Sequence, residues 1–179
     1  MGMPKPLLTW GEETLIQYQV RQLREAGAEP VIVVLGHGPE EIAPLVAGSD
    51  VVVNALWSEG PASSLRRGAE ALPESTAAVV VLGVDQPRPA YVLAALLDAH
   101  AIAGALISVP VFGGKRGHPV VLDASLVPEL LRVDEDTLGL RGVLERHAEG
   151  VQEVAMDSPV VLMDLNTVEE YKEALRFFG

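Results

Sequence analysis

The sequence has 179 residues, of which 49% are hydrophobic, so it holds enough apolar material for one well-packed domain, which we place over residues 1–179. Its 13 Lys and Arg residues against 25 Asp and Glu residues give a net charge of −12, which argues against a nucleic-acid partner because nucleic acids bind basic surfaces. The absence of cysteine excludes disulfides and thiolate zinc sites, and the absence of a signal peptide or a membrane-length apolar run predicts a cytoplasmic protein with no membrane partner.

Short apolar strands and amphipathic helices alternate along the chain. Thr9 with Glu12, and Thr167 with Glu170, have capping-box spacing, so we expect each pair to mark the start of a helix. Helices are predicted at residues 9–27, 39–47, 61–72, 91–101, 125–131, 137–147 and 167–178, and strands at residues 30–35, 51–53, 78–84, 105–111, 119–122, 151–156 and 160–164. This alternation predicts an α/β domain of three layers, in which helices cover both faces of a doubly wound, mainly parallel sheet.

The strand predicted at residues 78–84 is the one around which we expect the functional site. Its run of β-branched residues has no polar alternation, which favours burial on both faces. Asp85 follows directly, so we expect its carboxylate at the carboxyl end of the strand, where ligands bind in open α/β sheets. The alternative is an ordinary polar turn, because Asp is common where strands end.

A second carboxylate, Asp164, also ends an apolar run. If the two strands are neighbours, Asp85 and Asp164 point into one crevice. Two hard oxygen ligands suit Mg²⁺, which fills its other positions with water and phosphate. The alternative for Asp164 alone is that it only ends a strand or caps a helix. No pair of histidines has the spacing of zinc ligands.

Three further segments carry groups suited to anions. Lys5 lies between two prolines that stiffen its backbone, and it either neutralises phosphate or is an ordinary solvated lysine. Small residues from Gly60 to Ser64 open a helix, where amides and hydroxyls either bind a ligand or cap the helix. The loop at residues 113–118 combines glycines, cations and His118, and it is either an anion-binding loop or a flexible surface loop.

Taken together, these segments resemble the MobA/MocA-type molybdenum cofactor nucleotidyltransferases, and most closely the cytidylyltransferase (MocA-like) branch. The matching segments are Met1-Gly-Met-Pro-Lys5, Asn54 through Ser64-Leu-Arg-Arg-Gly68, Asp85-Gln-Pro87, Gly117-His-Pro119 and Asp164-Leu-Asn-Thr167. They occur in the family's order and cover nearly the whole chain. Each motif is short, so the resemblance rests on the order of all of them.

The resemblance implies a Rossmann-like nucleotidyltransferase fold. It also implies a reaction that joins CTP, or GTP in the sister branch, to the phosphate of molybdopterin with release of pyrophosphate. The implied cofactor is Mg²⁺, and a molybdoenzyme is implied as a further partner. Such a reaction needs positioning and charge neutralisation rather than a nucleophilic side chain.

The resemblance also assigns roles to individual residues by motif matching. Lys5 and Asp85 are the implied catalytic residues, because Lys5 would neutralise the triphosphate while Asp85 and Asp164 hold the metal. The implied nucleotide-binding residues are Asn54, Gly60 and Ser64, together with Lys5. On the other side of the site, Gly117 and His118 would face the pterin-type acceptor.

This sequence departs from the family at one point. The family normally has a strand and a glycine-rich loop, of the form Leu-Ala-Ala-Gly-x-Ser-x-Arg, directly before the Met-Gly-x-Pro-Lys segment with which this sequence begins. That strand would be central in the sheet, and the amides of the loop would cradle phosphates. Without it, the two neighbouring strands would have unpaired backbone groups. We therefore expect that the 179-residue chain alone is not a competent transferase and that an upstream extension restores activity.

Two other functions agree with the same residues. One is a glycosyltransferase of related architecture, which would use its metal to hold a nucleotide sugar. The other is a non-catalytic nucleotide-binding protein, which the absent glycine-rich loop makes credible. Pyrophosphate release separates the first alternative from nucleotidyl transfer, and nucleotide binding without turnover identifies the second.

Overall fold

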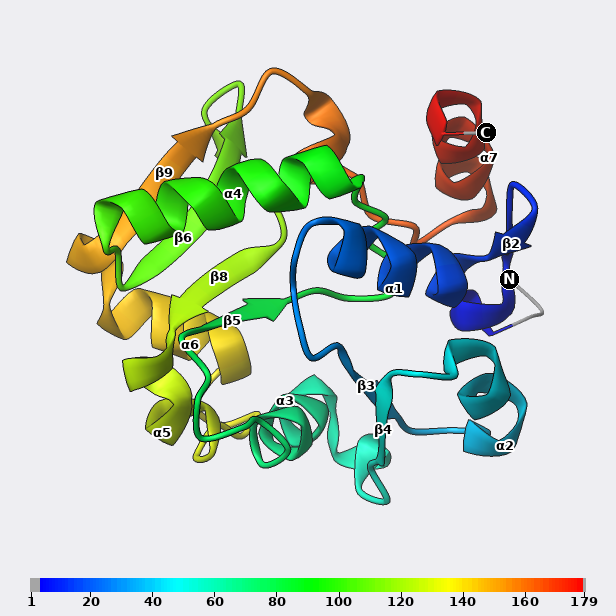
Figure 1. The fold of residues 1–179 in the computed structure, drawn as a ribbon, viewed down its shortest axis with the longest axis horizontal. Helices are drawn as coiled ribbons and strands as arrows, with labels where there is room; N and C mark the ends of the chain where they lie inside the picture. The colour runs from blue at the N-terminus through cyan, green and yellow to red at the C-terminus, as the bar shows by residue number, and fades with distance from the viewer. Residues whose placement is uncertain (1–3, 179) are drawn as a thin grey trace.

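The computed structural model describes residues 4–178 and shows an α/β architecture (Figure 1). Met1, Gly2 and Met3 of the predicted Met-Gly-Met-Pro-Lys motif, and the side chain of Phe178, lie outside the described part. The helices are α1 (Leu15–Glu25), α2 (Pro39–Ile42), α3 (Pro61–Ala69), α4 (Ala90–Ala103), α5 (Val127–Leu130), α6 (Gly139–Arg146) and α7 (Val168–Phe178). The strands are β1 (Thr9–Trp10), β2 (Glu13–Thr14), β3 (Ile32–Leu35), β4 (Asp50–Val53), β5 (Ala78–Val81), β6 (Ile107–Phe112), β7 (Lys115–Arg116), β8 (Val120–Asp123) and β9 (Val151–Ala155).

The strands form two main sheets rather than one. β3 and β4 pair in parallel, whereas β5, β8 and β6 follow one another in a second sheet, in which β7 and β9 also pair with β6. Only the β6–β9 pair of this second sheet is parallel. The prediction of a mainly parallel sheet is therefore wrong, and the sheet is mixed. The cause is the short segment between β6 and β8, because a parallel return needs a crossover of about a dozen residues or more.

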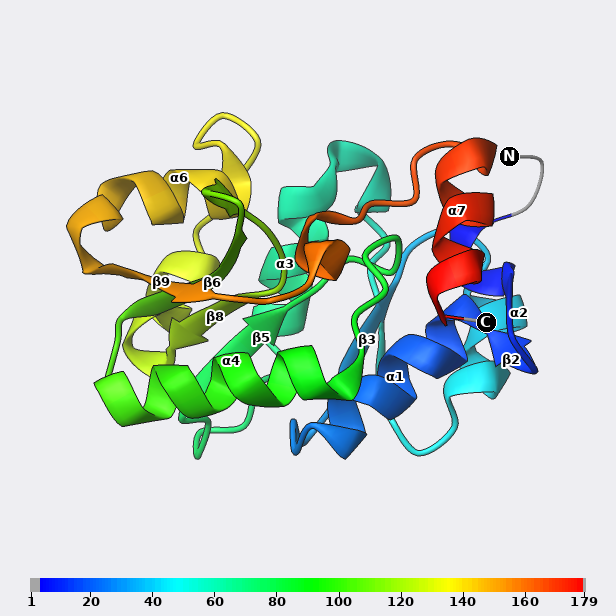
Figure 2. The same ribbon diagram turned by 90° about the horizontal axis from the view of Figure 1, so that it is seen from above.

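Helices cover both faces of the five-stranded sheet, as the predicted three layers require. Figure 2 shows α4 along one face and α6 on the opposite face. The larger core lies on the α6 side, where Leu122 of β8, Leu130 of α5 and Val143 of α6 have no exposed surface. Burial of such a side chain stabilises the fold by about 1.5–3 kcal/mol. No helix within residues 4–178 combines the length and the apolar character needed to cross a membrane.

The first helix begins later than the capping-box spacing of Thr9 and Glu12 predicts. Thr9 belongs to a small hairpin of β1 and β2, which turns at Gly11 with a positive φ of 65°. The helix is instead capped by Thr14, whose backbone N–H donates to the Gln17 side chain at 3.0 Å. Two overlapping cap signals compete here, and the glycine decides between them because it reverses the chain before the helix starts.

The second capping-box prediction is confirmed at the start of α7. The backbone N–H of Thr167 donates to Glu170 Oε2 at 2.8 Å, and the backbone N–H of Glu170 donates to Thr167 Oγ1 at 3.1 Å. Here no glycine or proline competes with the cap, so the local sequence alone determines where the helix begins.

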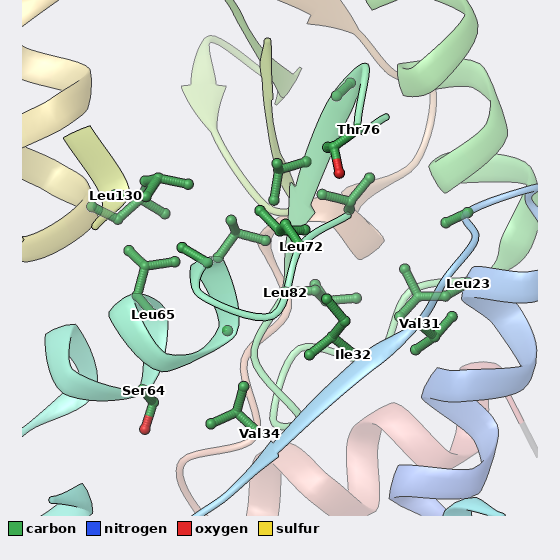
Figure 3. A pocket seen from close by; sticks show the side chains of 18 of the residues that line it. Leu23, Val31, Ile32, Val34, Ser64, Leu65, Leu72, Thr76, Leu82 and Leu130 are labelled. Carbon is green, nitrogen blue, oxygen red and sulfur yellow. The ribbon is translucent and has the colours of Figure 1, made fainter. Parts of the chain in front are cut away.

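Between β3 and β5 lies a cavity of about 880 Å³, which we call the slot (Figure 3). Residues from β3, β5 and α3 line it. The four residues of β5 are consequently half-buried, which corrects the prediction that this strand is buried on both faces. β5 is also shorter than predicted, and it ends at Val81 rather than at residue 84.

Candidate active site

The structure brings Asp85 and Asp164 together, as the sequence predicts, but not from two adjacent strands. The backbone N–H of Leu165 donates to the Asp85 carbonyl at 2.8 Å, which joins the two acidic segments side by side. Asp164 follows the 3₁₀ helix η6 (Pro159–Leu162), so the strand predicted at residues 160–164 is wrong. Pro159 and the capping side chain of Ser158 start this 3₁₀ turn, although the apolar residues after them have the composition of a strand.

Lys5 lies directly beside this pair. Its Nζ is 2.8 Å from Asp85 Oδ2 and donates to Asn166 Oδ1 at 3.1 Å. The Lys5 and Asp85 side chains are 31% and 32% exposed, so their ion pair contributes only about 0–1 kcal/mol to stability. The ion pair fixes the Lys5 ammonium beside the two acidic segments.

One oxygen of Asp164 accepts no hydrogen bond within residues 4–178, although the Asp164 side chain as a whole is 41% exposed. Its Oδ1 atom is buried and accepts no hydrogen bond from the residues that the structure describes. The nearest cationic atom, Nη2 of Arg88, lies 4.0 Å away, which is beyond hydrogen-bonding distance. A buried carboxylate oxygen left in this state is unfavourable. A cation between Asp164 and Asp85 would relieve it.

The donor set fits a magnesium site in which the protein supplies few ligands. Asp85 and Asp164 provide two carboxylates, and within residues 4–178 no group of three or more His, Cys, Asp or Glu side chains is arranged to hold a metal. Mg²⁺ usually binds through one or two carboxylates and completes its shell with water and substrate phosphates. The residues present therefore suit a metal that arrives together with a phosphate-bearing ligand.

Arg88, which the sequence analysis did not identify, holds the segments of this site together. Its guanidinium is fully buried and donates to three backbone carbonyls of two segments: the His118 carbonyl from Nε at 2.8 Å, the Met163 carbonyl from Nη1 at 2.8 Å and the Val161 carbonyl from Nη2 at 3.0 Å. Burial lowers the pKa of Arg88 to about 10, and the negative charges of Asp164 and Asp85 oppose this shift. The group therefore keeps its charge at neutral pH.

Helix α1 holds the Asp85 turn from its other side. The Nε2 atom of the buried Gln19 donates to the carbonyls of Gly83 at 3.1 Å and Gln86 at 2.7 Å, and its Oε1 accepts from the Arg88 N–H at 3.1 Å. One amide thus makes three hydrogen bonds across the turn that carries Asp85. A glutamine on an amphipathic helix is usually solvated, so the local sequence gave no signal of this role.

Gly117 and His118 lie next to the acidic pair. Gly117 is buried, and a Cβ at this position would overlap the carbonyl oxygen of Val161. The His118 N–H donates to the same carbonyl at 2.9 Å. Burial lowers the pKa of the His118 imidazole, against the opposing charges of Asp164 and Asp85, so the ring is neutral at pH 7.

Asn54, Gly60 and Ser64 form a second group, in the loop between β4 and α3. Asn54 is only 3% exposed, and its Nδ2 lies 2.8 Å from Ser63 Oγ and 3.0 Å from Ser64 Oγ. Its Oδ1 accepts from the Leu56 N–H at 3.0 Å. The Asn54 amide therefore shapes the loop from inside, while Gly60 and Ser64 are half-buried and residues 55–59 between them and Asn54 are exposed.

A carboxylate from a distant loop occupies the start of α3. Glu135 Oε1 accepts a hydrogen bond from the Ala62 N–H at 2.8 Å and lies against Gly60, where a Cβ would collide with it. Gly60 has a φ of 112°, which only glycine adopts without strain. Glu135, Ser64 and Gly83 all line the slot, so the slot borders both groups of candidate site residues.

Residues 1–151 match the MobA-like NTP transferase domain, and the chain belongs to this family. The fold and the family define a nucleotidyltransferase, which transfers a nucleotidyl group from a nucleoside triphosphate. Nicotine blue oxidoreductase from Paenarthrobacter nicotinovorans is 29% identical over 177 residues, which is 93% of this chain and 85% of that protein.

Two solved structures of similar sequence support the fold. Rv0371c from Mycobacterium tuberculosis H37Rv is 27% identical and superposes with a TM-score of 0.84, covering 98% of this chain and 90% of that chain. A complex of Rv0371c with manganese, also 27% identical, gives a TM-score of 0.79 over 98% of this chain and 93% of that chain. The α/β nucleotidyltransferase-like fold is thereby established for this chain.

Proposed function

We propose that this chain is a Mg²⁺-dependent nucleotidyltransferase that joins CTP, or GTP, to the phosphate of a molybdopterin-type acceptor and releases pyrophosphate. The observation that carries the proposal is the meeting of the Asp85 and Asp164 segments beside Lys5, with one buried Asp164 oxygen that accepts no hydrogen bond within the described residues. The manganese complex of the similar Rv0371c supports a divalent metal in this fold. The choice of CTP and of the acceptor rests on the resemblance of the motifs to the MocA-like branch.

The reaction needs no nucleophile from the protein. An oxygen of the acceptor phosphate attacks the α-phosphorus of the nucleotide and forms a new P–O bond, while the bond to the β-phosphate oxygen breaks and pyrophosphate leaves with its electron pair. Mg²⁺, held by Asp85 and Asp164, supplies neutralisation of the phosphate charge. The residues of the chain orient the two substrates and keep opposing charge close to them.

Lys5 is the cation that the proposal places at the triphosphate. Its contact with Asp85 at 2.8 Å keeps the ammonium at the edge of the metal site. The buried Arg88 cannot take this role, since its donors are directed at backbone carbonyls. We therefore assign Lys5 to phosphate neutralisation and Arg88 to the positioning of the site.

The two ends of the site receive different substrates in this proposal. Gly60 and Ser64 lie by the nucleotide, and Asn54 holds their loop in shape. Gly117 and His118 face the acceptor. Because the His118 ring is neutral, it would contact the acceptor by hydrogen bonding or packing rather than by charge. A molybdoenzyme that takes up the finished cofactor remains the further partner of this proposal.

A second candidate is a redox reaction. The relative that matches this chain over 93% of its length carries the name of an oxidoreductase, nicotine blue oxidoreductase. A redox protein built on the same fold would need neither pyrophosphate release nor the paired aspartates. Oxidation or reduction of nicotine blue, with no consumption of CTP or GTP, would identify this alternative.

The test combines metal binding with turnover. Mn²⁺ titrations followed by electron paramagnetic resonance would measure metal affinity in the presence of CTP for the wild-type chain, for Asp85→Asn and for Asp164→Asn. Pyrophosphate release with CTP or GTP and molybdopterin would be measured on the 179-residue chain and on a form extended upstream by the strand and glycine-rich loop.

We expect each aspartate variant to weaken metal binding about tenfold or more and to abolish most turnover of the extended form, with an unchanged far-ultraviolet spectrum. Asp50→Asn, at the start of β4 and away from the site, is the matched control. The proposal fails if the extended form binds no metal with CTP, or if both aspartate variants keep wild-type turnover.

A further inference from the structure

The outer edge of β4, on the side away from β3, carries backbone groups that pair with no strand of the described chain. Within residues 4–178, β4 pairs only with β3, in parallel. The N–H groups of Asp50 and Asn54 donate to carbonyls of the β3 segment at 3.0 and 2.8 Å. The direction of the backbone groups alternates along a strand, so the N–H and C=O groups of Val51 and Val53 point to the outer edge.

This edge lacks the features by which proteins keep an edge strand from pairing. Natural edge strands avoid pairing through lysine, proline, a bulge or a covering segment. β4 has the sequence Asp-Val-Val-Val, without lysine or proline, and its register with β3 is regular. Val51 and Val53 are 37% and 50% exposed, so residue types that suit a covered strand lie open to solvent at this edge.

The two exposed valines continue a hydrophobic core outward. They stand opposite Val33 and Leu35 of β3, which are buried in a cluster that includes side chains of α1 and α2. Just after β4, Leu56 and Trp57 are 52% and 47% exposed. We call the two valines with Leu56 and Trp57 the β4 patch. Apolar surface gathered in one place in this way is typical of an interaction site.

We propose that a second copy of this chain covers the β4 patch, and that the two β4 strands pair antiparallel across a two-fold axis. In the register that uses the outward backbone groups, Val51 of each copy stands opposite Val53 of the other. Each such pair exchanges both of its N–H···O=C bonds, and Val52 faces its own copy at the axis. This interface is self-complementary, as a two-fold dimer requires, and it leaves no free edge at β4 for a third copy.

Charges at the two ends of β4 favour a second copy as the occupant. Asp50 begins the strand, is exposed and points to the sheet face on which α3 packs. Arg67 of α3 lies at the other end of the strand, with its Nε 3.5 Å from the Val53 carbonyl. Antiparallel pairing brings the start of one β4 to the end of the other, so Asp50 of each copy comes beside Arg67 of the other. The register set by the backbone groups therefore also pairs opposite charges, twice in each dimer.

The size of the β4 patch indicates a weak dimer. Stable interfaces bury about 1,200–2,000 Å² in total. A strand of four residues with two further side chains is a smaller surface than this. We therefore expect a dissociation constant on the order of tens of micromolar. The chain is then a monomer at low micromolar concentration, and its association is independent of the proposed catalytic activity.

Sedimentation equilibrium of the 179-residue chain, without nucleotide or metal, tests the proposal over concentrations from about 5 to 500 µM. We expect the apparent mass to double over this range for the wild type. Val53→Lys should keep the chain monomeric, because it places a charge at the pairing edge. Ile102→Lys is the matched control, since Ile102 of α4 is another exposed hydrophobic residue, with 87% of its surface exposed, and its replacement should leave the dimer intact.

An exchange of charges tests the register. Asp50→Arg and Arg67→Asp each bring like charges together across the axis, so each should weaken association about tenfold or more. The double variant pairs opposite charges again and should recover most of the wild-type association. Amide hydrogen exchange followed by NMR adds a direct measure of strand pairing. Exchange at Val51 and Val53 should slow as the protein concentration rises, whereas exchange at Val52, whose N–H points to β3, should change little.

A chain that stays monomeric at every concentration would overturn the proposal, and so would a dimer that Val53→Lys leaves intact. A dimer that Ile102→Lys disrupts would place the interface at α4 instead. Failure of the double charge variant to recover association would contradict the antiparallel register. The charge exchange does not depend on the folding of Val53→Lys, because Asp50 and Arg67 are both exposed side chains.

Discussion

At the scale of single residues, the candidate site depends on the buried guanidinium of Arg88, whose hydrogen bonds all go to the backbone of the protein. Arg88 binds carbonyls of His118, Val161 and Met163, which belong to the two segments that flank Asp164 and the acceptor side. Burying a guanidinium is unfavourable unless its donors are paired, and here the backbone of the site itself supplies the acceptors. The position of Asp164 is thus set by hydrogen bonds that do not involve its own carboxylate.

Replacing Arg88 by Lys should therefore damage geometry more than charge. Lysine keeps the positive charge but has no planar fork, so it cannot bind three separate carbonyls. We expect a loss of Mn²⁺ affinity and a fall of about 100-fold in kcat of the extended form, because small displacements of reacting groups have effects of this size. Electron paramagnetic resonance and steady-state kinetics would measure both quantities.

A core variant provides the control for Arg88→Lys. Val143→Ala, a core substitution on α6, should lower the melting temperature without changing Mn²⁺ affinity. If Arg88→Lys lowers stability but leaves metal affinity and kcat as in Val143→Ala, the arginine is structural only and has no positioning role in the site.

His100 is a second buried residue whose ionisation has a measurable consequence. Its Nδ1 lies 2.9 Å from Ser108 Oγ, and Ser108 donates to Gln152 Oε1 at 2.9 Å, so the His100 Nδ1–H is the donor to Ser108. Burial lowers the pKa of His100, and the charge of Asp123 opposes this shift only in part. The folded state therefore favours the neutral ring.

The stability of the protein should fall as the pH is lowered through about 6.5, the pKa of histidine in the unfolded chain. Below that pH the unfolded chain binds a proton that the folded His100 resists, and the effect levels off below the lowered folded-state pKa. Urea unfolding between pH 7.5 and 5.5 should show a shallower pH dependence for His100→Asn than for wild type. The exposed His37→Asn should keep the wild-type slope, and an unchanged slope in His100→Asn would remove this residue as the cause.

At the scale of elements, the sequence correctly predicted those features that depend on contacts between residues close together in the chain. The start of α7 follows from Thr167 and Glu170 alone, and the sequence located it correctly. The segments of Asp85 and Asp164 lie side by side as expected, but the premise of two adjacent strands is wrong, because Asp164 follows a 3₁₀ helix. In contrast, the antiparallel β5–β8 pairing depends on contacts between segments far apart in the sequence, which helix and strand periodicity does not report.

For the same reason, the sequence contained no sign of the residues whose side chains bind the backbone of distant segments. Gln19, Arg88 and Glu135 bind the backbone of segments more than sixty residues away or on another element. Their residue types are usually exposed, so composition assigns them to the surface. Only the folded chain reveals that each one holds a turn or a helix start of the candidate site.

The segment between β6 and β8 carries Gly117 and His118, which the proposed function places on the acceptor side. Gly117 packs against the Val161 carbonyl and orients His118, so the two residues can be tested separately. His118→Ala should raise the apparent KM of the acceptor at least about threefold more than that of the nucleotide, since it removes a contact from one substrate only. Gly117→Ala should lower both stability and kcat, because the Val161 backbone must shift. Equal KM effects of His118→Ala on both substrates would contradict its placement.

At the scale of the whole molecule, the charge balance limits how anions bind. The net charge of −12 repels a nucleoside triphosphate and a phosphorylated acceptor alike, so attraction must come from local cations. Lys5 is in position, whereas the Arg88 guanidinium is committed to backbone carbonyls. The overall charge therefore adds a reason, independent of the motifs, for a divalent metal at the acidic pair.

The division of the sheet also predicts how the 179-residue chain unfolds. β3 and β4 share one short parallel ladder, and Val51 and Val53 of β4 are 37% and 50% exposed. β6, by contrast, pairs with β7, β8 and β9 and has four consecutive buried residues. Because the slot interrupts backbone pairing between β3 and β5, little hydrogen bonding couples the two sheets.

We therefore expect the two-stranded sheet of β3 and β4 to open without global unfolding. Hydrogen exchange at the amides of β4 should then be about 100-fold faster than at those of β6 under native conditions. Mass spectrometry of peptides covering β4 and β6, in low urea concentrations, would measure the two rates. Global unfolding should expose β6 with a larger urea dependence than the opening of β4, because more surface is exposed. Equal protection from hydrogen exchange and an equal urea dependence at both strands would contradict this prediction. Such a result would mean that helix packing across the slot makes the chain one cooperative unit without strand pairing between β3 and β5.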